Sequence, residues 1–244
     1  MAQYFAFDYQ GSPFVLFGTW HILALLGICV VTLAMLGFRK AAENTRRTVR
    51  WGMAIFLFLD DASWQIWIVY WGHWSIQTML PLHLCSIMMA LACFMLLFKS
   101  YPLYEFVYFL GIAGAFQALI TPPIGIYGFP HFRFIQTFIS HGLLLTSAIY
   151  MTSVEGFRPT WKSLLRVAIG VNIYMGMVGL INWAIGSNYL FIAHKPATAS
   201  MLDLLPAWPW YILWIEIIGL GMCLILYLPF AVKDGRIKTE VDPA

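Results

Sequence analysis

The chain has 244 residues, of which 61% are hydrophobic and only 10% are charged, and its mean hydropathy is +0.77. A water-soluble domain carries roughly a quarter charged residues, so this composition excludes one and predicts an integral membrane protein. Fourteen Lys and Arg against eleven Asp and Glu give a net charge of +3. That charge is too small to indicate a nucleic-acid partner.

Apolar runs of about 20 residues predict an all-α bundle of seven transmembrane helices, organised as one integral membrane domain over residues 1–244. The expected spans are Phe14–Gly37, Arg50–Tyr70, Met79–Phe98, Leu103–Ile120, Phe134–Met151, Leu164–Ile185 and Trp210–Phe230. Pro102 and Pro122 bound the fourth span and leave it short. The N-terminus lacks the basic region and cleavage site of a signal peptide, so we expect the first span to be retained.

The basic residues predict the orientation of the spans. Twelve of the fourteen flank the connections and tail on one side: Arg39, Lys40, Arg46, Arg47, Arg50, Lys99, Arg158, Lys162, Arg166, Lys233, Arg236 and Lys238. Arg133 and Lys195 fall on the other side. The positive-inside rule then places the N-terminus outside and the C-terminus in the cytosol of a multi-pass cell-membrane protein.

Two outer connections are too apolar for ordinary solvated loops. They are Thr121–Arg133, which is rich in Pro, Gly and aromatic residues, and Gly186–Pro209. We expect both to pack at the outer membrane surface and to cover a site there.

Polar side chains inside the expected spans gather in the half nearest the outer surface, roughly 5–15 Å below it at the rise of an α-helix. They are His21, Asp60, Asp61, Gln65, His83, Cys85, Gln117, Gln136, His141, Asn182 and Glu216. The inner halves hold little comparable besides Asn172. A single amide more commonly links helices, but such links have no reason to prefer one half, and ionisable groups at this depth usually face the bundle interior or a wet cavity. We expect a polar cavity open toward the outer leaflet.

Cys85 and His141 are expected at the same depth, roughly 10 Å below the outer surface. The other cysteines, Cys29, Cys93 and Cys223, fall in inner halves, where a cysteine is normally a small hydrophobe. Pro81 fits the first turn of a helix that enters the membrane shortly before Cys85. A thiol in apolar surroundings needs a base beside it to act as a nucleophile. The depths therefore predict a Cys85–His141 dyad, and the alternative is a packed cysteine with a hydrogen-bonded histidine.

Several neighbours are candidates for supporting roles. His83 is two helical positions from Cys85 and points elsewhere, so it would hold the site or bind a lipid head group. A carboxylate or amide is expected to orient the imidazole. The candidates for that role are Asp60, Asp61, Asn182 and Glu216, and the sequence does not separate them.

Five segments carry a family resemblance that covers nearly the whole chain. They are Leu-Pro-Leu-His-Leu-Cys-Ser-Ile (80–87), Gly-Ala-Phe-Gln-Ala-Leu-Ile-Thr-Pro (114–122), Phe-Pro-His-Phe-Arg-Phe-Ile-Gln-Thr-Phe-Ile-Ser-His-Gly (129–142), Asn-Tyr-Leu-Phe-Ile-Ala-His-Lys-Pro (188–196) and Pro-Ala-Trp-Pro-Trp-Tyr (206–211). In this order they resemble the bacterial YwaF-type integral membrane family. That family is related to a vertebrate TMEM protein described as a cysteine-dependent acyltransferase, and it is more distantly similar to androgen-induced membrane hydrolases.

The resemblance implies a lipid acyltransferase or acyl hydrolase that works through an acyl-cysteine. By motif, the nucleophile corresponds to Cys85 and the catalytic histidine to His141. The implied partners are a phospholipid or lysophospholipid, and no cofactor is implied. Donors to an oxyanion would come from His83, Gln117 or Asn182.

Two other classes remain open. One is a metal-dependent lipid hydrolase with ligands among His83, His131, His141, Asp60, Asp61 and Glu216, although no HExxH motif supports it and we assign no metal ligand. The other is a small-molecule transporter or receptor with an outward polar pocket. The absence of visible inverted repeats speaks against a typical secondary transporter.

Overall fold

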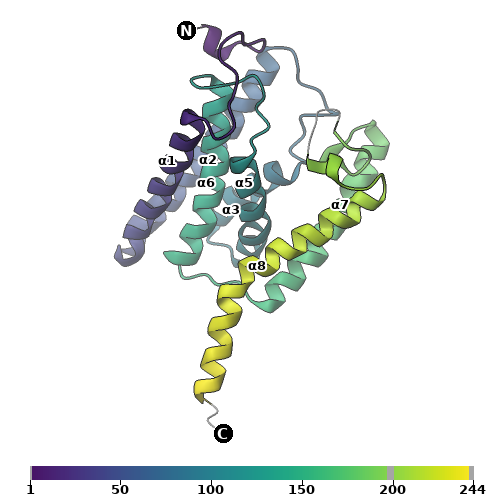
Figure 1. Ribbon diagram of the computed structural model, residues 1–244. Helices are drawn as coiled ribbons and strands as arrows, with labels where there is room; N and C mark the ends of the chain where they lie inside the picture. The colour runs from purple at the N-terminus through teal and green to yellow at the C-terminus, as the bar shows by residue number, and fades with distance from the viewer. Residues whose placement is uncertain (1, 197–200, 242–244) are drawn as a thin grey trace. The chain divides into compact units, whose positions relative to one another are not determined.

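The structure is a computed structural model that describes residues 2–196 and 201–241, with side chains for residues 3–196 and 202–234. The side chains of Arg236 and Lys238, and residues 197–200 of the second outer connection, lie outside the described part. In chain order the helices are η1 (Ala2–Phe5), α1 (Thr19–Met35), η2 (Leu36–Lys40), α2 (Glu43–Tyr70), α3 (Leu84–Phe98), α4 (Tyr101–Phe106), the π-helical η3 (Val107–Gly111), α5 (Ile112–Ile120), α6 (Phe132–Ser153), α7 (Trp161–Ile185), η4 (Tyr189–Phe191), η5 (Met201–Leu204) and α8 (Trp210–Val241) (Figure 1).

The described residues form helices and no strand, which confirms the all-α prediction for a multi-pass membrane protein. Six helical segments are long and apolar enough to cross a membrane, and α3 is a shorter apolar helix. The six correspond to every expected span except the third. Continuous apolar runs are helical because each backbone N–H and C=O must be satisfied within the segment when water is absent.

The third span differs from its prediction at its outer end. We expected it to begin at Met79, with Pro81 in its first turn, but α3 begins at Leu84. The preceding backbone bonds to a side chain instead of continuing a helix. The hydroxyl of Tyr189 accepts the Leu80 N–H at 2.8 Å and donates to the carbonyl of Ile76 at 2.7 Å.

Contacts divide the chain into two compact units, one made of residues 1–74 and 85–157 and the other of residues 75–84 and 158–244. In the first unit α6 is the most buried span. It contacts α1, α2 and α5 (Figure 1). The residues on α6 are therefore the ones that several other helices can approach.

Small and polar side chains set how closely α1, α5 and α6 pack. A Cβ added to Gly142 would lie 2.8 Å from Ile28, so the absence of a side chain allows α1 to approach α6. Deeper along the same pair, the hydroxyls of Thr32 and Thr146 bond at 2.8 Å. On α1, the fully buried His21 bonds to the Leu119 carbonyl at 2.9 Å and so joins α1 to the end of α5.

The fourth span is continuous from Tyr101 to Ile120, but it is not a regular α-helix throughout. Its middle, Val107–Gly111, is a π-helical turn. Such turns insert one residue into an α-helix and are frequent at functional sites. Gly111, the last residue of this turn, packs against α6, since an added Cβ would lie 3.4 Å from Leu144 Cδ1.

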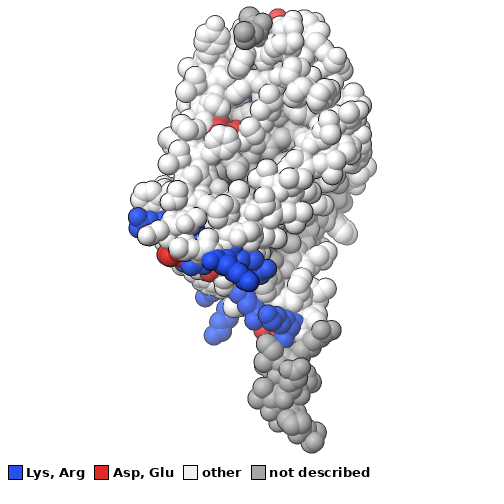
Figure 2. All heavy atoms as spheres, turned by 90° about the vertical axis from the view of Figure 1, so that its left-hand side faces the viewer, with Lys and Arg blue, Asp and Glu red and all other residues white. Residues whose placement is uncertain are grey.

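At the end of the first unit that is expected to face the cytosol, called the inner end below, a cluster of five charged side chains joins α2, the end of α3 and the end of α6. Glu155 pairs with Arg50 and Lys99, and Glu43 pairs with Arg46, Arg50 and Lys99. The Glu155 side chain is fully buried and that of Arg50 is 4% exposed. In the space-filling view Lys and Arg gather at one end of the visible face, with almost none over the rest (Figure 2).

The N-terminal segment packs on the first outer connection. Tyr127 donates its hydroxyl to the Phe7 carbonyl at 2.7 Å, and His131 Nε2 bonds to the Ala6 carbonyl at 3.0 Å. A Cβ added to Gly128 would lie 2.3 Å from the Ser12 carbonyl oxygen, so only glycine allows this approach. The connection is thus packed against the N-terminal segment, a contact that was not predicted from the sequence.

Candidate functional site

His141 has a defined orientation in α6. Its Nδ1 lies 2.9 Å from the carbonyl oxygen of Thr137 and 3.2 Å from Ser140 Oγ. Because a carbonyl only accepts hydrogen bonds, the Thr137 contact assigns the ring proton to Nδ1. Nε2 is then the unprotonated nitrogen, and it has no hydrogen-bond partner among the described residues. A neutral imidazole in this tautomer can take up a proton at Nε2.

Cys85 lies in the first turn of α3, half-buried. Its sulfur contacts α5, since a Cβ added to Gly114 would lie 3.4 Å from Cys85 Sγ. Within the described side chains no hydrogen bond joins Cys85 to His141. Gly114 therefore marks the place on α5 that the thiol faces.

The packing of α5 on α6 gives the depth of both groups. The two helices are antiparallel neighbours, and Gly111 faces Leu144. Three residues toward the outer end, or about 4.5 Å along each axis, lead from Gly111 to Gly114 on α5 and from Leu144 to His141 on α6. The level of Cys85 Sγ on α5 is consequently the level of His141 on α6.

A chain of polar contacts runs from Arg133, in the first turn of α6, to α2. Arg133 donates to Gln136 Oε1, and Gln136 Nε2 donates to Asp60 Oδ2 at 2.8 Å. The Arg133 guanidinium carbon also lies 3.6 Å from the centroid of the Trp64 ring. Asp60 and Gln136 are buried, while Asp61 is half-buried. Asp60 is therefore bonded to the side-chain amide of Gln136. The group that orients His141 is the main-chain carbonyl of Thr137.

The two amides proposed as oxyanion donors have different surroundings. Gln117 is exposed near the end of α5. Asn182, near the end of α7, is buried and fully engaged: its Oδ1 accepts from Ser187 Oγ at 2.7 Å and Tyr189 N at 2.8 Å, and its Nδ2 donates to the Tyr189 carbonyl at 2.9 Å. Asn182 shapes the loop after α7.

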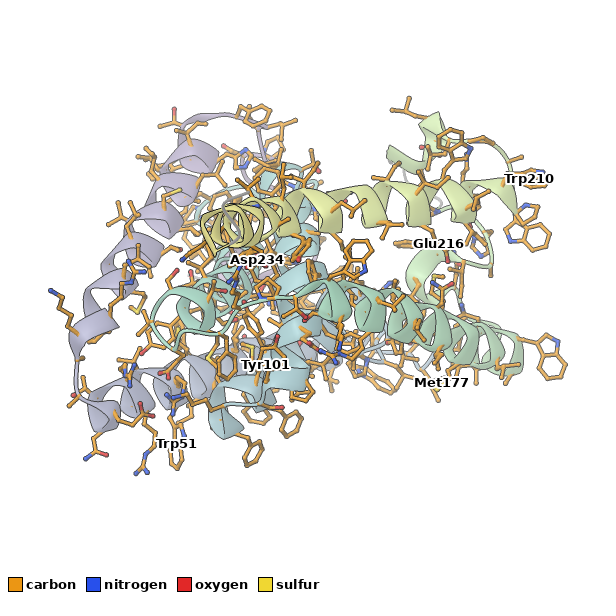
Figure 3. All side chains as sticks on the ribbon, turned by 90° about the horizontal axis from the view of Figure 1, so that it is seen from below. Trp51, Tyr101, Met177, Trp210, Glu216 and Asp234 are labelled. Atoms are coloured by element: carbon orange, nitrogen blue, oxygen red, sulfur yellow. The ribbon has the colours of Figure 1, made fainter. Side chains whose placement is uncertain are left out.

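His83 and Glu216 belong to the second unit, unlike Cys85 and His141. The His83 ring lies against Tyr189 and Phe191, at centroid distances of 5.2 and 5.1 Å. Glu216 lies on α8, six residues after Trp210 (Figure 3). In the same unit Leu190 and Phe191 have φ values of 59° and 53°, a strained conformation for bulky residues.

Metal-binding geometry is not found in the described residues, since no three His, Cys, Asp or Glu side chains group closely enough to hold an ion. His131, which we considered as a ligand, is used structurally. It is fully buried, accepts the Arg133 N–H through Nδ1 at 3.1 Å and thereby caps α6. His21 likewise has both ring nitrogens bonded within the protein.

Three features of this region were not predicted from the sequence, namely the Thr137 carbonyl that bonds to His141, the Arg133–Gln136 contact and the Gly114 that faces Cys85. Two of them have a sequence signal, because residues three or four apart share a helix face. Thr137 and His141 are four residues apart, and Arg133 and Gln136 are three residues apart. Gly114 has no such signal, since its role depends on which helix packs beside it.

Comparison with protein families gives one match. The sequence matches the model of the TMEM164 family over residues 16–227. Neither a curated protein nor a solved structure matches the chain.

Proposed function

Because the chain belongs to the TMEM164 family, we propose that it is a membrane enzyme that moves a fatty acyl chain from a lipid ester through Cys85, with His141 as the general base. The observation that carries this proposal is the placement of His141 on α6 and of Cys85 Sγ against the neighbouring helix α5. His141 is fixed with Nε2 unprotonated, and Cys85 Sγ faces Gly114 at the same level. The proposed donor is a phospholipid of the cell membrane that enters from the outer leaflet.

The first half of the reaction forms an acyl-enzyme. His141 Nε2 takes the proton of Cys85, and the thiolate attacks the ester carbonyl carbon of the lipid. When the tetrahedral intermediate collapses, the ester C–O bond breaks. The leaving lysolipid oxygen receives the proton from His141, and the acyl chain remains on Cys85 as a thioester.

The second half regenerates the thiol. A lysophospholipid hydroxyl or a water molecule gives its proton to His141 and attacks the thioester carbonyl. The C–S bond then breaks, and the leaving sulfur takes the proton back. A lysolipid acceptor makes the enzyme a transferase, and water makes it a hydrolase. Thr137 Oγ1, which is buried and has no partner in the described structure, is an additional candidate donor to the oxyanion.

The test is the intact mass of the protein after incubation with a phospholipid. We expect a mass increase of one fatty acyl group, lost on treatment with hydroxylamine, which cleaves thioesters. Cys85→Ser should lose turnover while keeping its fold, and His141→Ala should lower turnover by about 10²–10⁴-fold.

Cys93→Ser is the matched control, since Cys93 lies on the same helix and its thiol donates to the Ala54 carbonyl at 3.5 Å. That variant should retain the adduct and activity. An acyl adduct that survives in folded Cys85→Ser, or is lost in Cys93→Ser alone, would contradict the assignment of Cys85.

A further inference from the structure

Thr137 carries a buried hydroxyl that differs from the other buried hydroxyls of α6. The residue is 2% exposed, and its Oγ1 has no hydrogen-bond partner in the described structure. Four other hydroxyls of the helix are satisfied: those of Ser140, Ser147 and Thr152 donate to main-chain carbonyls three or four residues earlier, and that of Thr146 bonds to Thr32. A threonine inside a helix commonly bonds to such a carbonyl, and an unpaired buried hydroxyl is costly. The hydroxyl of Thr137 is therefore available to a ligand.

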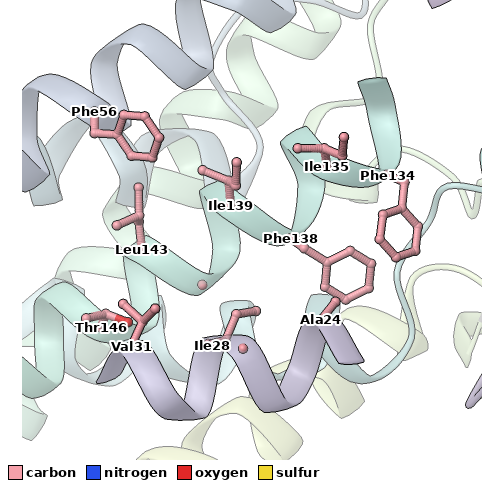
Figure 4. Close-up of a pocket in the computed structure, with 12 residues that line it drawn as sticks. Ala24, Ile28, Val31, Phe56, Phe134, Ile135, Phe138, Ile139, Leu143 and Thr146 are labelled. Atoms are coloured by element: carbon pink, nitrogen blue, oxygen red, sulfur yellow. The ribbon is translucent and has the colours of Figure 1, made fainter. Parts of the chain in front are cut away.

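Thr137 shares one face of α6 with His141 and Leu144, because positions four and three residues apart span only about 60° of the helix. Leu144 packs against Gly111, so this face looks toward α5. The side chains of α6 that line the apolar groove beside α1, such as Leu143, belong to another face (Figure 4). Neither Thr137 nor His141 lines that groove. The free hydroxyl and the imidazole consequently lie on the same side of α6.

The imidazole of His141 lies against the turn that carries this hydroxyl. Its Nδ1 is 2.9 Å from the Thr137 carbonyl oxygen, which directs the ring toward the outer end of α6. The residue is half-buried, and Nε2 has no hydrogen-bond partner among the described residues. One turn of the helix thus presents a hydrogen-bond acceptor, Nε2, and a hydroxyl, Oγ1, that are both unpaired. A ligand hydroxyl is complementary to this pair, since it donates through its hydrogen and accepts through its oxygen.

The two halves of the proposed reaction use the pair differently. In the first half, Nε2 receives the proton of Cys85. In the second half the sulfur is acylated, and the acceptor hydroxyl gives its proton to Nε2. The acceptor oxygen then lies beside Thr137, because that residue holds the ring. It can accept a hydrogen bond from Oγ1 while its other lone pair attacks the thioester.

We propose that Thr137 binds the acceptor hydroxyl of the acyl transfer, a role that rests on the proposed function. The acceptor O–H donates to His141 Nε2, and Thr137 Oγ1 donates to the acceptor oxygen. As the new C–O bond forms, the acceptor proton moves to Nε2. The C–S bond then breaks, and the sulfur of Cys85 takes that proton. Thr137 keeps its own proton throughout and orients the attacking oxygen. Water and a lysophospholipid hydroxyl share this chemistry, so one residue serves hydrolysis and transfer.

The test measures the two halves separately. The protein in detergent micelles is kept in excess over dioleoyl phosphatidylcholine, so that each donor reacts once. In quenched samples, the rise and fall of the acyl mass on the protein give the rates of the first and second halves. Deuterium-labelled lysophosphatidylcholine is added in one arm and omitted in the other. Labelled phosphatidylcholine then reports transfer to the lysolipid, and free oleate reports transfer to water.

Thr137→Val keeps the shape of the side chain and removes the unpaired hydroxyl, so the variant should fold as well as the wild type. We expect the rise of the acyl mass to be unchanged and its fall to be slower by about three- to tenfold, the effect of one lost hydrogen bond. Thr137→Ser keeps the hydroxyl and should restore the wild-type rate. Thr146→Val is the matched control on the same helix, because its hydroxyl bonds to Thr32, and it should change neither rate.

Two results with folded Thr137→Val would overturn the proposal. Equal slowing of the rise and the fall would make Thr137 a donor to the oxyanion, which forms in both halves. Unchanged rates in both arms would show that its hydroxyl takes no part in the reaction. Slower fall in one arm alone would support the proposal and identify the acceptor as the lysolipid or as water. The absence of an acyl mass on the wild type would instead contradict the proposed function itself, whereas either failure at Thr137 would leave Cys85 as the nucleophile.

Discussion

The two ends of the first unit both bury charged side chains, but they satisfy them differently. At the inner end each of the five charged groups contacts an opposite charge. At the outer end two carboxylates, Asp60 and Asp61, accompany a single Arg133, and an amide stands between that arginine and Asp60. His141 keeps an unbonded ring nitrogen at this end. Burial is thus common to both ends, and the difference lies in how the charges are paired: the charged groups of the inner cluster contact one another directly, whereas at the outer end an amide separates Arg133 from Asp60.

The largest effect is expected from the inner cluster. Glu155→Gln removes the anion that faces buried Arg50 and Lys99, and breaking a buried pair costs about 3–5 kcal/mol. We expect the free energy of unfolding, measured by denaturant titration in detergent, to fall by that amount. The activity per folded molecule should stay unchanged. A loss of activity without a loss of stability would show that the inner end is not a structural clamp.

A smaller effect is expected at the outer end. Gln136→Leu leaves both Asp60 and Arg133 without the amide, at a cost of about 1–3 kcal/mol for an unsatisfied buried group. The same denaturant titration measures it. Asp60→Asn is the matched control, because its side-chain oxygen can still accept from Gln136. If Gln136→Leu destabilised the protein as much as Glu155→Gln, the distinction between the two ends would fail.

Between the two ends, the hydrogen bond between the Thr32 and Thr146 hydroxyls shows how much an uncharged polar contact contributes to the free energy of unfolding. Thr32→Val keeps the shape and removes the hydroxyl. Hydrogen bonds between membrane helices are worth about 0.6 kcal/mol on average, and we expect a loss of that order in the unfolding free energy. A loss above about 2 kcal/mol would mean that this uncharged contact stabilises the protein as much as the charged clusters do.

The smallest effect is expected from pH, since a single ring titrates. Burial lowers the pKa of His131, the bond to the Ala6 carbonyl opposes this, and Arg133 adds to the lowering. The unfolded chain therefore binds a proton near pH 6.5 that the folded protein takes up only at lower pH. Stability should be complete above that pH and decline as the pH falls toward the folded pKa.

Thermal unfolding at pH 7.5 and 5.5 measures the effect of His131. His131→Asn should depend less on pH, since asparagine is a good N-cap for α6 and does not titrate. Equal pH dependence in both proteins would assign the effect to another group.

Composition and apolar runs predicted the helical spans well, because lipid leaves the backbone few alternatives. The outer start of α3 was not predictable in this way. Residues 79–83 are as apolar as a span, yet Tyr189, more than 100 positions later, bonds to the Leu80 N–H and to the carbonyl of Ile76 just before them. A contact of that kind has no periodic pattern in the sequence.

The candidate site was predictable in part. Depth alone placed Cys85 and His141 at one level, and α5 and α6 have a register that agrees with it. The orienting group was sought among carboxylates and amides, whereas His141 bonds to the Thr137 carbonyl, a group that every residue possesses. Glu155 was overlooked because it follows the expected span and pairs with Arg50, 105 residues away.

The π-helical turn at Val107–Gly111 affects how insertions and deletions would act on this protein. A π-turn holds one residue more than the α-helix around it. Deleting one residue there would restore a regular helix, but every position from Ile112 to Ile120 would rotate by about 100°. Gly114 would then turn away from Cys85, and a bulkier neighbour would take its place. The span would remain long enough for the membrane, so such a deletion would preserve insertion while it rearranged the surface that the thiol faces and turned the buried side chains of Ala115 and Leu119 away from α6.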